Sequence, residues 1–95
     1  MTELEIVCRN APNGTDWTCE VTVDVDRGAT TNHVVTVIST DLARLDPGAR
    51  DPHLLVDRSF RFLLEREPNT SILREFNLME IARYFPDFEA TIASG

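Results

Sequence analysis

The chain has 95 residues, of which 42% are hydrophobic and 26% are charged, and its formal net charge is −7 at pH 7. This composition is typical of one globular domain, and no apolar run approaches the roughly 20 residues that a membrane-spanning helix requires. The first residues, Met1–Glu5, lack the basic and apolar regions of a secretory signal, so we expect a cytoplasmic protein with no membrane partner. All nine basic residues are arginine, a bias typical of a GC-rich bacterial genome.

Acidic side chains outnumber basic ones in each of the segments 1–33, 34–70 and 71–95. Binding to nucleic acid depends on a basic surface that neutralises phosphates, so we expect no nucleic-acid partner. Acidic membrane surfaces are disfavoured for the same reason.

The first half of the chain has the hydrophobic pattern of β-strands. Leu4, Ile6 and Cys8 share one face of a first run, and apolar and polar residues alternate strictly over Trp17–Val25. Asn13-Gly14 between these runs is the preferred centre of a two-residue type I′ turn. A hairpin around that turn pairs Cys8 with Cys19 and places the apolar residues of both strands on one face.

A third β-branched run, His33–Ile38, completes a predicted three-stranded antiparallel β-meander over residues 3–38. Its outer edge carries no charged side chain, and soluble proteins cover an open apolar edge because it invites aggregation. We therefore predict coverage by a second copy in a homodimer, by a partner peptide or by the loop 46–52. The candidate interaction edge consists of Val34, Val35, Thr36, Val37 and Ile38.

From Ser39 onward the hydrophobic period is helical. Ser39 or Thr40 can cap a short helix over Asp41–Leu45. Asp51-Pro52 is a start signal for the main helix, which we expect to run to about Arg66, because proline suits the first helical position.

The end of the chain predicts shorter helical elements. Residues 71–76 read as a helical turn, and Asn77 can cap a last helix that Pro86 ends. Phe88 and Ile92 would return the tail to the core, and residues 93–95 would be frayed. The sequence therefore predicts one domain, 1–95, of the α+β class: the β-meander followed by three to four short helices over 39–92, packed on one face.

Neither a metal site nor a cofactor site is expected. Cys8 and Cys19 read as reduced core thiols, because the cytosol keeps thiols reduced, with a disulfide as the alternative. Zinc sites bring ligands in close pairs, whereas Cys8, Cys19, His33 and His53 are far apart in the sequence.

No combination of nucleophile, base and oxyanion donors stands out, so we predict that the protein is not an enzyme. Nothing in the sequence obliges His33 or His53 to meet Ser59 as in a nucleophilic triad. A pocket that joined Arg58, Arg61 and His53 would instead favour an enzyme.

Two short helices meeting at Asn77 within residues 71–84 could form a helix-turn-helix, although their connection is shorter than usual. The order of elements, three antiparallel strands followed by three helices, resembles the winged-helix peptide-recognition modules of peptide-modification pathways. The resemblance implies a leader peptide bound by strand addition beside a helix groove.

We therefore expect a non-catalytic protein-interaction or regulatory module with a protein or peptide partner. The alternatives are a winged-helix-like peptide-recognition domain and a helix-turn-helix regulator. A third class is DNA mimicry, which predicts two rows of acidic side chains on one surface.

Overall fold

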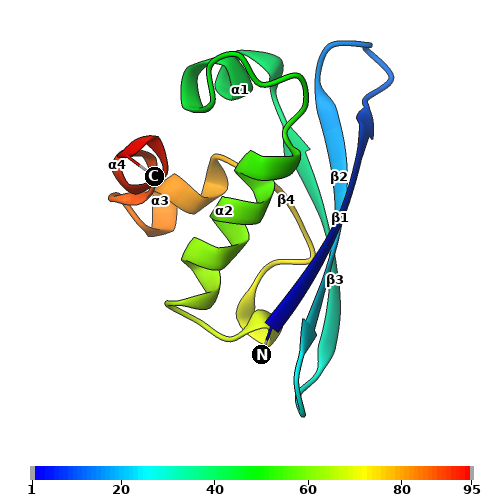
Figure 1. The fold of residues 1–95 in the computed structure, drawn as a ribbon, viewed down its shortest axis with the longest axis vertical. Coiled ribbons are helices and arrows are strands. Elements are labelled where there is room, and N and C mark those ends of the chain that lie inside the picture. Colours follow the sequence, from blue (N-terminus) through cyan, green and yellow to red (C-terminus); the bar gives the residue numbers. More distant parts are fainter. Residues whose placement is uncertain (1, 95) are drawn as a thin grey trace.

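The computed structural model describes residues 2–94, which form a four-stranded sheet and a layer of helices (Figure 1). The strands are β1 (Thr2–Asn10), β2 (Trp17–Val25), β3 (Thr30–Val37) and β4 (Glu75–Asn77). The helices are α1 (Ser39–Leu45), α2 (His53–Leu64), the 3₁₀ helix η1 (Asn69–Ser71), α3 (Glu80–Tyr84) and α4 (Phe88–Ser94).

The strands lie in the order β1-β2-β3-β4. The first three are antiparallel, whereas β4 runs parallel to β3. All four α-helices lie on one side of this sheet (Figure 1). The predicted α+β class is confirmed, but the prediction of a purely antiparallel three-stranded sheet is wrong, because a fourth strand makes the sheet mixed.

The register of the first hairpin is as predicted, with Cys8 opposite Cys19, but its turn is different. The Ala11 amide donates to the Asp16 carbonyl at 2.8 Å, so the strands are closed by a four-residue loop over residues 12–15. Within this loop Gly14 alone has a positive φ, 78°, whereas a type I′ turn needs two such residues. The Asn13 carboxamide oxygen accepts the amides of Thr15 and Asp16, which stabilises the longer loop.

The longer loop changes which residue pairs of the hairpin are hydrogen-bonded. Bonded and non-bonded pairs alternate along an antiparallel ladder, so closure at Ala11 and Asp16 makes Cys8 and Cys19 a non-bonded pair. Such pairs bring the backbones close, and here the two Cα atoms are 4.0 Å apart and the sulfurs form a disulfide. The prediction of reduced thiols is therefore wrong.

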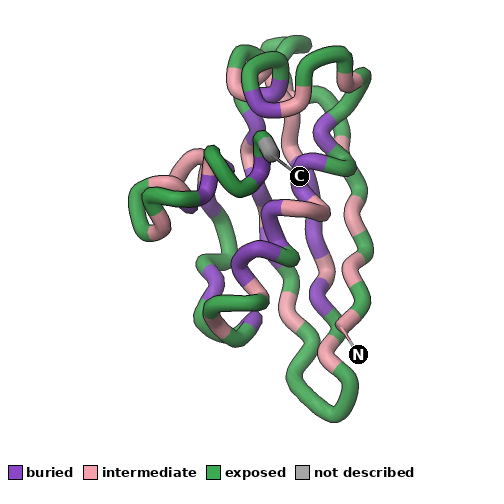
Figure 2. The backbone as a smooth tube through the Cα atoms, turned by 60° about the vertical axis from the view of Figure 1, so that its left-hand side comes forward, coloured by how far each residue is buried: buried purple, intermediate pink, exposed green. Residues whose placement is uncertain are grey.

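The core lies between the sheet and the helices, as the buried stretches in Figure 2 show. The inner face of the sheet contributes β-branched residues of β2 and β3, and α2 contributes the largest apolar stripe. The buried residues of these elements include Cys19, Val21, Val23, Val35, Val37, Leu55, Val56, Phe60 and Leu63. Phe88 and Ile92 of α4 are also buried, as the sequence predicts.

The predicted helix α1 is present, but its cap comes from another element. Its first residue, Ser39, donates its amide to the Asp16 carboxylate at 2.9 Å, and neither Ser39 nor Thr40 caps the helix with its own side chain. The main helix, α2, falls within the predicted bounds. The tail at 93–94 belongs to α4 rather than to a frayed end, and residue 95 lies outside the described residues.

The predicted helical turn over 71–76 is wrong. This segment leaves η1 in an extended conformation and becomes β4, in which Phe76 is buried against the core. The physical reason is the edge of β3, whose free backbone groups a strand satisfies and a helix does not. The pair of helices that a helix-turn-helix requires is consequently not formed over 71–84.

Candidate functional site

The predicted interaction edge on β3 is covered by the chain itself. The Val34 amide donates to the Arg74 carbonyl at 2.7 Å, and the Leu78 amide donates to the Thr36 carbonyl at 2.9 Å. Coverage by the chain itself, one of the predicted possibilities, is thus found over residues 34–36, although β4 rather than the loop 46–52 provides it.

The side chains of the predicted edge point to different surroundings. Val35 and Val37 are fully buried in the core, and Val34 and Thr36 are half-buried. Ile38, just after the strand, is 37% exposed. The five residues thus form no continuous apolar surface for a partner.

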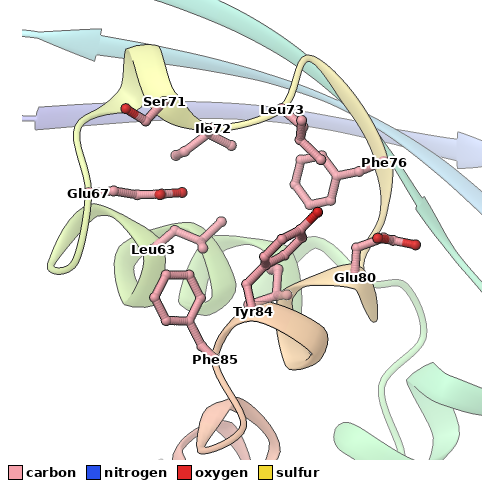
Figure 3. A pocket seen from close by; sticks show the side chains of 10 residues that line it. Leu63, Glu67, Ser71, Ile72, Leu73, Phe76, Glu80, Tyr84 and Phe85 are labelled. Atoms are coloured by element: carbon pink, nitrogen blue, oxygen red, sulfur yellow. The ribbon is translucent and has the colours of Figure 1, made fainter.

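The covering segment instead helps to form a pocket of about 440 Å³, which we name the β4 pocket (Figure 3). It lies where the end of α2, the segment after η1, β4 and α3 meet. Its lining residues are Leu63, Glu67, Ser71, Ile72, Leu73, Phe76, Glu80, Ile81, Tyr84 and Phe85.

The β4 pocket has a buried apolar floor and an exposed apolar rim. Ile72, Phe76 and Ile81 are buried, so the floor is part of the packed core. Leu73 and Tyr84 on the rim are 52% and 69% exposed, so apolar surface beside the concave floor is open to solvent. Figure 3 shows the Tyr84 ring reaching towards Leu73 and Phe76.

Two carboxylates flank this apolar surface. Glu67 follows α2 and Glu80 begins α3, and the lining includes no basic side chain. Glu80 lies 3.5 Å from the guanidinium of Arg83, but that arginine is largely exposed, so solvent screens the pair. The electrostatic potential at the pocket therefore favours a cation beside an apolar group.

The polar side chains of the pocket carry two hydroxyls and two carboxylates. Its hydroxyl groups belong to Ser71 and Tyr84, and no histidine or cysteine lines it. The arrangement can bind a ligand.

His33, on β3, connects the segment before β4 to the sheet. It is 2% exposed, its Nδ1 lies 2.7 Å from the Leu73 carbonyl oxygen, and its Nε2 lies 2.9 Å from the Thr31 hydroxyl. A carbonyl oxygen accepts hydrogen bonds, so Nδ1 carries the proton and donates it. His33 thereby fastens the residue that forms the pocket rim to β3.

The other residues considered for catalysis are not brought together. Buried Ser59 donates its hydroxyl to the Leu55 carbonyl at 2.7 Å, within α2. Arg58 and Arg61 line one cavity, whereas His53 lines another, so the pocket that would have favoured an enzyme is not formed.

Within residues 2–94 the structure has no group of three or more histidine, cysteine or acidic side chains that could hold a metal ion. In the same part of the chain, no helix is long and apolar enough to cross a membrane.

No family model matches the chain, and no match is found among curated proteins or solved structures.

The β4 pocket was not predicted from the sequence, because its walls come from segments whose proximity depends on β4. The one local signal is the apolar content of residues 72–85, from which short helical elements are predicted.

Proposed function

We propose that the protein is a non-catalytic interaction module that binds a peptide segment of a partner protein at the β4 pocket. The bound segment places an aliphatic or aromatic side chain on the apolar floor. A neighbouring lysine or arginine of the peptide then lies beside Glu67 and Glu80.

The observation that carries this proposal is the exposure of Leu73 and Tyr84 around a buried apolar floor. Apolar clefts with few polar groups are the usual form of ligand sites, and tyrosine is enriched among residues that dominate binding energy. Binding would remove both rim side chains from water.

The carboxylates support the cationic part of the ligand. The pocket lining carries acidic side chains without basic ones, and the whole chain has a net charge of −7. Complementary charge speeds association and discriminates against acidic partners. A peptide with an apolar residue beside lysine or arginine fits both properties of the site.

This proposal differs from the peptide-binding mode that the winged-helix resemblance implies. Strand addition at β3 is not part of it, because β4 already pairs with Val34–Thr36. A homodimer through residues 33–38 would require β4 to leave the sheet, so we do not include it in the proposal.

The cytoplasmic location remains a prediction, and the Cys8–Cys19 disulfide weighs against it. Disulfides persist in oxidising compartments and are reduced in the cytosol of most cells. Trapping free thiols with an alkylating reagent during cell lysis would decide the location, since a cytosolic protein should be labelled on both cysteines.

Selection from a random dodecapeptide library tests the proposed function. We expect enriched peptides to share an apolar residue next to lysine or arginine. Their affinity, measured by calorimetry, should fall at least tenfold for Leu73→Asp, because the change places a charge in the desolvated contact.

Leu54→Asp is the matched control, since Leu54 is also exposed but lies on α2 away from the β4 pocket. It should leave peptide affinity unchanged. Peptides without a shared pattern, or equal affinity for both variants, would contradict the proposal.

A further inference from the structure

A second, smaller cavity lies between α2 and α4. Its volume is about 220 Å³, and it is separate from the β4 pocket. Three of the nine arginines line it, together with an apolar wall. Its lining residues are Arg58, Arg61, Phe62, Glu65, Arg66, Thr91 and Ile92.

Two of these arginines already have their partners. Arg61 donates from Nε to the Asp57 carboxylate at 3.2 Å. Arg66 donates to the Asp87 carboxylate at 3.1 Å, and its guanidinium lies 3.5 Å from the centre of the Phe62 ring. The charges of Arg61 and Arg66 are therefore compensated within the protein.

Arg58 is different. Its Nε is buried and has no hydrogen-bond partner, and no carboxylate among the described residues forms an ion pair with this arginine. A buried donor on a charged group is costly when it is left unsatisfied. The Arg58 side chain lines the cavity, and an anion bound at the terminal nitrogens of its guanidinium would compensate its charge.

We propose that this cavity binds a monocarboxylate carried on a short apolar group, with Arg58 as the anion-binding residue. The planar guanidinium matches a carboxylate in two parallel hydrogen bonds. Phe62 and Ile92 provide an apolar wall for the attached group, and the cavity volume admits a group of a few carbon atoms.

The charge balance favours a monoanion over a phosphate dianion. Arg58 contributes one uncompensated positive charge, while Glu65 on the exposed rim contributes a negative one. A dianion would meet one free guanidinium and the repulsion of Glu65. A carboxylate places its single charge on Arg58 and its apolar part against the wall.

Such a carboxylate has two possible sources with the same chemistry: a free carboxylic acid or the C-terminal residue of a peptide. The inference goes beyond the proposed function and does not rest on it, since the two cavities share no lining residue.

Titrations of the protein, followed by NMR shifts of its backbone amides, test the inference. The probes are hexanoate for a free acid and N-acetylleucine for a peptide C-terminus, with N-acetylleucinamide and inorganic phosphate as controls. We expect one or both acids to shift amides of α2 and α4, and the tighter acid identifies the source. The uncharged amide should bind at least tenfold more weakly than N-acetylleucine if the peptide terminus is the source.

Arg58→Gln should weaken binding of the tighter acid by roughly tenfold to a hundredfold, as expected for loss of a charge-assisted pair. Arg50→Gln is the matched control, because Arg50 has no ion pair among the described residues and lines a different cavity. Phosphate binding as tight as the acids, equal binding of the tighter acid to both variants, or no shifts in α2 and α4 would overturn the inference. If Arg58→Gln does not fold, the affinities of the unmodified protein for the two acids and for phosphate still test the inference.

Discussion

The two edges of the sheet are protected in different ways. β1 is nine residues long, and within residues 2–94 no strand other than β2 lies beside it. Its outward-facing side chains include the charged residues Glu3, Glu5 and Arg9. β3 carries no such charges at its covered end, and the three-residue β4 pairs with it there. Charge suffices to discourage pairing at one edge, whereas the apolar edge needs a strand of the same chain.

The difference also determines where a binding site forms. β1 is held by its hairpin and by the Cys8–Cys19 disulfide. β4 is held by a few hydrogen bonds and by Phe76, whose ring lies 6.1 Å from that of Phe60. Because β4 also forms one wall of the β4 pocket, the covering of the edge and the shape of the site depend on the same residues.

Phe76→Ala should have the largest effect on stability, about 3–5 kcal/mol in the free energy of unfolding, because it leaves a cavity where β4 meets the core. Ile6→Ala on β1 is the comparison, since Ile6 is half-buried and lies on the other edge. Its cost should be smaller, as measured by urea denaturation. A larger cost for Ile6→Ala would contradict the role of Phe76 in holding β4 to the core.

Reduction of the disulfide should have the next largest effect. Adding a reductant should lower the free energy of unfolding by roughly 2–4 kcal/mol, because the bond restricts the unfolded chain. Reduction should destabilise the pairing of β1 and leave peptide binding at the β4 pocket unchanged. Peptide affinity that disappears on reduction would show instead that the two edges are coupled.

Acid should have a smaller effect, through the contact between the first hairpin and α1. Hydrogen bonds from the Ser39 amide and then from the Asn13 side chain lower the pKa of Asp16 below its ordinary value of 3.8. A carboxyl group whose pKa is lower in the folded state than in the unfolded state stabilises the protein at pH values above the unfolded-state pKa. This stabilisation is lost as the pH falls through the folded-state pKa.

Asp16→Asn removes this charge and keeps a carbonyl oxygen at the same place. The variant should be less stable than the unmodified protein near neutral pH and equally stable below the lowered pKa. Thermal melts across this range measure the difference. A difference between the two proteins that did not change with pH would contradict the role of the Asp16 charge.

The parts of the structure that local patterns determine could be predicted from the sequence. Alternating apolar residues over β2 fix which face is buried, so the register of Cys8 with Cys19 was correct. The predicted turn type was wrong, because the Asn13 side chain accepts hydrogen bonds from two backbone amides and so stabilises a longer loop. The disulfide followed from that turn, since closure at Ala11 and Asp16 brings the cysteine backbones together.

β4 could not be predicted for a different reason. Glu75–Asn77 is too short to show a period, and its parallel partner is about 40 residues away in the sequence. The β4 pocket therefore has no signature of its own in the sequence. The unpaired Nε of Arg58 is likewise a property of packing between α2 and α4.

Amide hydrogen exchange tests the central claim, that β4 covers one edge of the sheet while the other remains open. The amides of Val34 and Leu78 donate across the β3–β4 edge, whereas the alternation set by the Ala11–Asp16 pair turns the Ile6 amide to solvent. We predict that Val34 and Leu78 exchange slowly and that Ile6 exchanges rapidly, in the same NMR experiment. Exchange of Val34 and Leu78 as fast as that of Ile6 would show that β4 does not cover the edge.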